Sequence, residues 1–192
     1  AKQIDFSVWQ SIELPSFENY ESHLDIKGMT MLCNIYLCRG EDFMWANDST
    51  NAMSSFIEAR RIAESIEEAS VHNSLGVFFR RMGWRLFAES EYLLALKSSH
   101  LTGFEKANVY VNLGNLKKDD GKYREAIDFY NKAISINRDN SDAIYNLNLA
   151  QAYNSLKQGS NANAVKYFEE ALVQPGADGR LSGRVVGART GR

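Results

Sequence analysis

The 34-residue segment 107–140 constrains the fold more than any other part of the chain, because small and large residues recur in it at fixed spacing. These residues are Tyr110, Leu113, Gly114, Gly121, Ala126, Tyr130 and Ala133. Steps of three and four place residues on one face of an α-helix, and both halves of the segment have this spacing. Between the halves, Gly121 can adopt the left-handed conformation that ends a helix. The segment therefore predicts two helices joined by a turn.

Small residues within this segment predict that the two helices touch closely. Gly114 has no Cβ, so the second helix can approach it, although glycine costs about 1 kcal/mol of helix propensity. Ala126 and Ala133 are the small residues that face this contact from the second helix. A bulky residue at either alanine would overpack the contact at a cost of about 1–3 kcal/mol. We therefore expect a tightly packed helix pair.

The same spacing occurs before and after this segment. Gly76 stands 38 residues before Gly114, and the matching downstream position holds Asn148, with a first helix one turn longer. A more degenerate copy begins at Gly28 and contains a long irregular connection over residues 39–51. The other matching positions are Leu75, Phe79, Gly83, Ala88, Tyr92 and Ala95 upstream, Ile144, Leu147, Gly159, Ala164, Phe168 and Ala171 downstream, and Ala52, Phe56 and Ala59 in the degenerate copy.

Over residues 20–174 this pattern resembles the tetratricopeptide repeat family, whose period is about 34 residues. The late proline of that family is absent, since His100 and Arg138 stand at its positions. The resemblance implies an all-α fold, a right-handed α-solenoid of stacked antiparallel helix pairs. Its repeats are expected at 20–67, 69–102, 107–140 and 141–174.

Three segments do not follow the repeat pattern. Residues 1–19 alternate apolar and polar side chains, which predicts an extended segment that packs along the first helices or in a groove of another copy. Residues 175–192 hold five glycines in eighteen positions without periodicity, which predicts disorder. The irregular connection 39–51 brings together Phe43, Met44 and Trp45. We expect these side chains to cap the first helix pair in preference to contacting a partner.

The resemblance also implies that the first helix of each pair lines a concave groove. The candidate binding residues on this face are Asn73, Arg80, Asn112, Asn115, Lys118, Tyr145 and Asn146. An asparagine amide carries one acceptor and two donors, which match a peptide backbone, and asparagine is a poor helix former that needs a reason to recur. Asn112 and Asn146 are interpreted as equivalent positions of a short ladder. The alternative is that these asparagines are ordinary polar surface.

These patterns favour a protein-interaction scaffold that binds an extended peptide or partner helix in the concave groove. One alternative is a substrate-presenting repeat region of a larger enzyme such as a protein glycosyltransferase, since the groove face is similar to the repeat region of the O-GlcNAc transferase. Another is a structural, self-associating module; the oligomeric state is left open. Hsp70 and Hsp90 C-terminal tails are not expected as partners, because Asn73, Asp142 and Asn146 stand where basic residues would hold their carboxylate.

Composition and spacing argue against several other classes of function. The net charge is −2. Residues 175–192 alone carry +3, so the remaining residues are acidic, which disfavours binding to nucleic acid. No apolar run is long enough to span a membrane. His23, His72 and His100 are scattered, and no nucleophile or phosphate-loop motif accompanies them, so we expect neither catalysis nor a cofactor. Two basic pairs at helix ends, Arg60-Arg61 and Arg80-Arg81, are attributed to helix dipoles and solvation.

The two cysteines, Cys33 and Cys38, are five residues apart on one predicted helix. Five residues rotate a side chain by about 500° around a helix, so the two thiols point to different sides. This spacing disfavours a disulfide or a metal pair and favours buried free thiols in a reducing compartment. We therefore expect a cytoplasmic protein.

Overall fold

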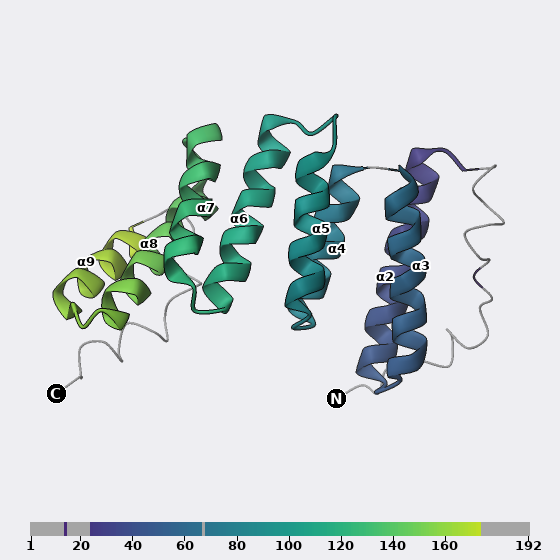
Figure 1. The fold of residues 1–192 in the computed structure, drawn as a ribbon, viewed down its shortest axis with the longest axis horizontal. Helices are drawn as coiled ribbons and strands as arrows, with labels where there is room; N and C mark the ends of the chain where they lie inside the picture. The colour runs from purple at the N-terminus through teal and green to yellow at the C-terminus, as the bar shows by residue number, and fades with distance from the viewer. Residues whose placement is uncertain (1–13, 15–23, 67, 174–192) are drawn as a thin grey trace.

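The computed structural model describes residues 14, 24–66 and 68–173, and within these ranges it contains eight helices and no strand (Figure 1). The all-α fold expected from the sequence is therefore confirmed. The segments 1–13, 15–23 and 174–192 lie outside the described residues, so the extended N-terminal segment and the disordered tail remain predictions. The helices are α2 (Ile26–Trp45), α3 (Ser49–Ile66), α4 (Ala69–Arg81), α5 (Arg85–Lys97), α6 (Gly103–Asp119), α7 (Tyr123–Ile136), α8 (Ser141–Lys157) and α9 (Asn161–Leu172).

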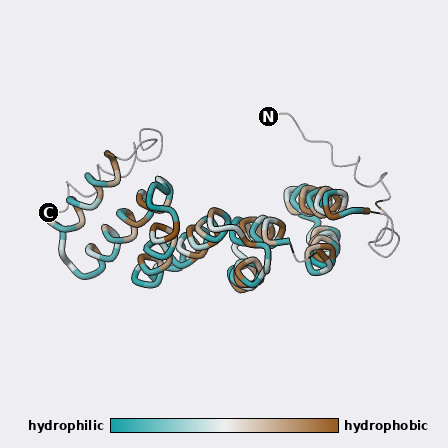
Figure 2. The backbone as a smooth tube through the Cα atoms, turned by 90° about the horizontal axis from the view of Figure 1, so that it is seen from above, coloured by the Kyte–Doolittle hydropathy of each residue, from teal (hydrophilic) through white to brown (hydrophobic). Residues whose placement is uncertain are grey.

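Consecutive helices pack as the pairs α2/α3, α4/α5, α6/α7 and α8/α9, and each pair packs on the next. Seen from above, the pairs follow one another along the long axis of the molecule (Figure 2). Neighbouring first helices contact one another, α2 with α4, α4 with α6 and α6 with α8, whereas the second helices have no comparable contacts with one another. Since neighbouring elements are closest on the inner side of a curved stack, the first helices form the inner wall of the solenoid.

A glycine allows the two helices to approach in each of the first three pairs. Added Cβ atoms would lie 2.0 Å from the ring of Phe56 at Gly40, 2.4 Å from Tyr92 at Gly76 and 2.5 Å from Tyr130 at Gly114. Real Cβ atoms do not come that close to another heavy atom. In every case the ring belongs to the residue sixteen positions later, on the second helix. The close helix contact predicted at Gly114 is thus present, and it recurs in the two preceding pairs.

The turns between paired helices define the register of the repeats. The residues with positive φ are Asn47 (63°), Gly83 (77°), Gly121 (70°) and Gly159 (76°). This left-handed conformation ends a helix at low cost for glycine and asparagine. The last three of these turns are 38 residues apart, so Ala152, not Asn148, occupies the position of Gly114. Asn146 therefore corresponds to Asn108, and the expected equivalence of Asn112 and Asn146 is wrong.

The first helix pair also differs from its sequence-based description. α2 continues through most of the expected irregular connection, and only residues 46–48 join it to α3. Phe43 is buried and Met44 packs against the core, as capping residues would, but Trp45 is 75% exposed. The atoms nearest to a Cβ on Gly28 would belong to Leu24 and Asp25 of its own segment, whereas those nearest to a Cβ on Gly40 belong to Phe56, so the contact glycine of this pair is Gly40.

Candidate functional site

The candidate site is the polar surface of α4, α6 and α8, which we call the first-helix wall. Six of the seven predicted binding residues are half-buried there, namely Asn73, Arg80, Asn112, Asn115, Lys118 and Asn146. The seventh, Tyr145, is buried in the apolar core between α8 and α9. It faces inward because Ala152, and not Asn148, occupies the position of Gly114. The wall is therefore made of amide and charged side chains without a tyrosine.

Two asparagines join α4 to α6 across this wall. The Nδ2 amide of Asn112 donates a hydrogen bond of 2.9 Å to Oδ1 of Asn73. This contact leaves the NH₂ group of Asn73 and the carbonyl oxygen of Asn112 without a protein partner in the described part of the chain. If both amides were rotated, one NH₂ group and one carbonyl oxygen would still remain. The pair therefore offers a donor and an acceptor side by side.

Other wall residues brace neighbouring first helices. Lys118 on α6 donates a 2.6 Å hydrogen bond to Oδ1 of Asn146 on α8, and Asn146 Nδ2 donates to the carbonyl oxygen of Asp142. Arg80 on α4 forms a 2.6 Å ion pair with Asp119 at the end of α6. Both Asn146 amide groups are therefore engaged within the protein, and the two cationic side chains hold the wall together.

Asn115 points from the wall toward the interior of its own helix pair. Its Oδ1 atom accepts a 2.8 Å hydrogen bond from the hydroxyl of Tyr130, the ring that packs on Gly114. Burial raises the pKa of Tyr130, with the charge of Asp119 acting in the same direction. Asn115 thus satisfies a buried hydroxyl and keeps only its NH₂ group for a ligand.

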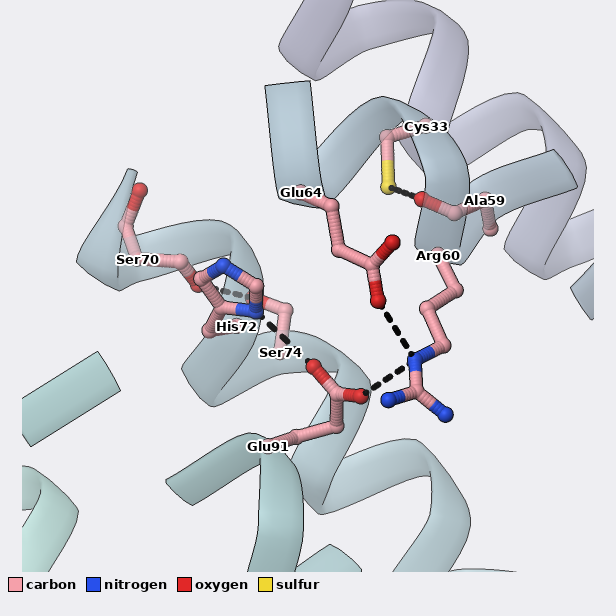
Figure 3. Close-up of polar contacts among 8 residues, drawn as sticks. All are labelled: Cys33, Ala59, Arg60, Glu64, Ser70, His72, Ser74 and Glu91. Carbon is pink, nitrogen blue, oxygen red and sulfur yellow. Dashed lines mark hydrogen bonds and ion pairs between the residues drawn. The ribbon is translucent and has the colours of Figure 1, made fainter. Parts of the chain in front are cut away.

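A network of polar contacts around the buried carboxylate of Glu91 joins the first two helix pairs (Figure 3). The carboxylate of Glu91 on α5 is 0% exposed and lies 2.8 Å from His72 Nδ1 on α4. Its other oxygen lies 3.3 Å from Arg60 Nε on α3, and the same Nε atom is 3.0 Å from Glu64. One carboxylate therefore ties α3, α4 and α5 together.

Little in the amino-acid sequence indicates this network. His72, one of three histidines scattered along the sequence, is only 5% exposed and contacts Glu91. The arginine pairs were attributed to helix dipoles, whereas the structure shows ion pairs from Arg61 to Glu58 and from Arg81 to Glu41. The one available signal was Glu91 itself, a carboxylate next to a core aromatic position. Its partners are too distant in sequence to be paired by spacing.

The cysteines lie on different sides of α2, as their spacing predicted. Cys33 is buried, and its Sγ donates to the carbonyl oxygen of Ala59 at 3.2 Å. Burial raises the pKa of Cys33 to about 12, and the nearby charge of Glu91 adds to this effect. Cys38 is exposed, which corrects the expectation that both thiols are buried.

Features of other functional classes are not seen among the residues that the structure describes. No group of three or more histidine, cysteine, aspartate or glutamate side chains is arranged to hold a metal ion in residues 14, 24–66 and 68–173. No helix in these ranges has the length and apolarity needed to cross a membrane.

Comparisons with known proteins agree with this architecture. Residues 107–140, which include most of α6 and all of α7, match the family described as tetratricopeptide repeat. Over 95 residues the chain is 30% identical to Protein O-mannosyl-transferase Tmtc3 of Drosophila melanogaster. This match spans 50% of the chain but only 9% of that protein.

Solved structures share the fold at low sequence identity. MamA is 21% identical with a TM-score of 0.50, and the match covers 84% of this chain and 95% of MamA. A tetratricopeptide repeat protein of Parabacteroides merdae is 20% identical with a TM-score of 0.50, covering 74% and 53% of the two chains. BtubC from P. vanneervenii is 19% identical with a TM-score of 0.54, covering 86% and 68%. Residues 107–140 therefore match a tetratricopeptide repeat, and the stacked helix pairs share the all-α fold of these solved structures.

Proposed function

We propose that this chain is a protein-interaction scaffold that binds an extended peptide segment of a partner along the first-helix wall. The tetratricopeptide fold generally mediates protein–protein interactions, and it is typically a non-catalytic scaffold. A cytoplasmic setting belongs to the proposal, because Cys33 and Cys38 are free thiols that a reducing compartment would preserve.

The observation that carries this proposal is the Asn73–Asn112 pair. Its remaining NH₂ group and carbonyl oxygen complement the C=O and N–H groups of a peptide backbone. Recognition of this kind depends little on the side chains of the peptide. It therefore suits an extended segment, whose backbone groups are not already paired within a helix.

The braces of the wall support binding in a second way. Lys118–Asn146 and Arg80–Asp119 fix the spacing of α4, α6 and α8 before a ligand arrives. A surface that is ordered in advance loses less conformational entropy on binding. In this proposal Arg80 and Lys118 also select side chains of the peptide, and the NH₂ group of Asn115 contributes a further donor.

A peptide library tests the proposal directly. Random twelve-residue peptides displayed on phage would be selected on the wild-type protein, and their Kd values measured by fluorescence polarisation. The Asn73→Ala/Asn112→Ala variant is expected to bind the selected peptides about thirtyfold more weakly, because a hydrogen bond contributes about 1 kcal/mol and two are lost. The matched control is Asn131→Ala/Asn163→Ala, which removes two exposed asparagines from the second helices α7 and α9.

Two outcomes would count against the asparagine pair as the binding element. One is equal affinity of the wild type and the Asn73→Ala/Asn112→Ala variant for every selected peptide. The other is an equal loss of affinity in the control variant, which would place the peptide on the second helices.

A further inference from the structure

We propose that a positively charged cleft at the rim of the solenoid is a second docking site, which binds an acidic peptide segment of a partner protein. The cleft has a volume of about 390 Å³ and lies between the turn from α6 to α7 and the end of α8. Lys122, Arg124 and Lys157 contribute three cationic side chains to its lining. The site is separate from the Asn73–Asn112 pair and goes beyond the peptide-binding function proposed above.

The three cations are weakly neutralised by the protein. Lys122 Nζ lies 4.0 Å from Asp120, and Lys157 Nζ donates only a long 3.4 Å hydrogen bond to the carbonyl oxygen of Gly121. Arg124 is exposed and has no ion pair or hydrogen bond in the described part of the chain. Their combined positive charge therefore remains available to a ligand.

The nearby carboxylates are already shared with other cations. Asp120 forms a 2.8 Å ion pair with Arg85, which reaches it from α5. Glu125 lines the cleft, but one of its oxygens lies 3.7 Å from Lys117. The cleft thus keeps a positive balance although the first 174 residues together carry a net negative charge.

Uncharged groups in the cleft also favour an anionic ligand. Asn154 and Gln158 line it, and neither side-chain amide has a protein partner in the described part of the chain. Tyr123 forms part of the same lining and is fixed by stacking on Tyr153, with ring centroids 5.5 Å apart. The cleft therefore brings together ammonium, guanidinium and amide donors on a lining in which Tyr123 is held in place.

The size and surroundings of the cleft indicate which anion it takes. A volume of about 390 Å³ accommodates a few carboxylate side chains of a short peptide. A nucleic acid would extend beyond the cleft over an acidic protein surface, which repels phosphates. An acidic peptide can place its carboxylates in the cleft and leave the rest of its chain in solvent.

The test uses fluorescein-labelled hexaglutamate and hexaglutamine peptides, titrated with the whole protein at low salt. We expect hexaglutamate to bind and hexaglutamine not to bind, with an affinity that falls as salt rises. The Lys122→Glu/Lys157→Glu variant is expected to bind hexaglutamate at least tenfold more weakly. The Lys157→Met variant, which removes one charge and retains the side-chain length, is expected to have an intermediate affinity.

The matched control is Lys97→Glu/Lys106→Glu, which changes the net charge equally at two exposed lysines outside the cleft. It is expected to stay within twofold of the wild type. An equal loss in this control would overturn the proposal by attributing binding to overall charge. Tighter binding of a single-stranded oligonucleotide, abolished by the same cleft variant, would overturn the assignment to an acidic peptide.

One further variant separates this inference from the proposed function of the wall. Asn73→Ala/Asn112→Ala is expected to leave hexaglutamate binding unchanged, since neither asparagine lines the cleft. A loss of hexaglutamate binding in that variant would show that the acidic peptide occupies the wall, and would overturn the rim site. Loss of library-peptide binding without loss of hexaglutamate binding is the result expected if both proposals hold.

Discussion

The N-terminal and C-terminal halves of the solenoid have the same architecture but different cores. Between α3, α4 and α5, Phe56 lies 4.5 Å from Phe78 and 5.4 Å from Trp84, measured between ring centroids. In the core formed by α6, α7 and α8, five of the seven buried residues are alanines. The core of the first half thus holds clustered rings, whereas the core between α6, α7 and α8 depends on small side chains that let helix backbones approach. The last pair again buries two rings, those of Tyr145 and Phe168.

The junctions between pairs follow from this difference. The backbones of α3 and α4 come close over only a short stretch, whereas those of α7 and α8 run alongside each other. The first junction is bridged by the buried carboxylate of Glu91, and the last by the half-buried Lys118–Asn146 hydrogen bond. Where rings keep helices apart, a buried charge spans the distance; where alanines bring them together, polar contacts on the wall are sufficient.

The largest effect is expected at the ring-filled core. Phe56→Ala should destabilise the protein by about 3–5 kcal/mol, because the removed ring is 2% exposed and leaves a cavity among three aromatic neighbours. Phe168→Ala, at the matching position of the last pair, should cost less, because local unfolding of α8 and α9 limits the loss. Urea denaturation followed by circular dichroism measures both values. Equal costs would show that the two halves are equally cooperative.

The second effect concerns the buried carboxylate. Glu91→Gln should cost about 2–3 kcal/mol, since it removes the charge that pairs with Arg60 and His72 while keeping the side-chain volume. The matched control is Glu89→Gln on the same helix, where the carboxylate is more exposed and pairs with Lys117. That change should cost less, about 1 kcal/mol, because the buried Lys117 keeps a second carboxylate, Glu125, at 3.7 Å. A cost for Glu91→Gln no larger than the control would mean that the network does not hold the first junction.

Local steric constraints made much of the fold predictable from sequence. Gly76 packs against Tyr92 and Gly114 against Tyr130, each within its own helix pair. Because these contacts are local, their spacing in the sequence identified the pairs. The register of α8 was not predictable in this way, because both Ala152 and Asn148 are candidates for the position that Gly114 occupies in α6. The choice between them depends on how the last pair stacks on its neighbour.

The candidate site was predictable only as a surface. Sequence spacing placed Asn73 and Asn112 on the same side of their helices, but their hydrogen bond joins residues 39 positions apart. The partners of Glu91 are likewise distant in sequence and come from two other helices. Such contacts depend on the stacking of whole helix pairs, which no local pattern specifies.

The third effect is a loss of stability at alkaline pH that involves the first half. The pKa of Cys33 is raised from 9.0 to about 12 in the folded protein, mainly by burial. The folded state therefore keeps a proton that the unfolded state releases above pH 9, so the stabilisation is complete below pH 9 and is lost as the pH rises toward 12. The slope for this group reaches about 1.4 kcal/mol per pH unit. Burial also raises the pKa of Tyr92, to about 12, so its contribution begins to fall above pH 10.

Urea denaturation at several pH values between 8 and 11 measures this dependence. Cys33→Ala should reduce the slope above pH 9, since the unfolded chain then has one fewer proton to release. Cys38→Ala is the matched control, because its thiol is exposed, and it should leave the slope unchanged. Identical slopes for wild type and Cys33→Ala would show that the thiol does not contribute to alkaline unfolding.

The smallest effect concerns the N-terminal caps of α4 and α6, the helices that follow the first and second junctions. Thr102 caps α6 through a reciprocal pair of hydrogen bonds with Glu105, whereas Glu68, at the start of α4, makes no side-chain capping bond. Thr102→Ala should therefore cost about 1 kcal/mol of stability in urea denaturation, and Glu68→Ala less than about 0.5 kcal/mol. The first junction would then depend on the contacts of Glu91 with Arg60 and His72, and the second partly on an ordered helix start. Equal costs at both positions would remove this distinction and leave core composition as the difference between the halves.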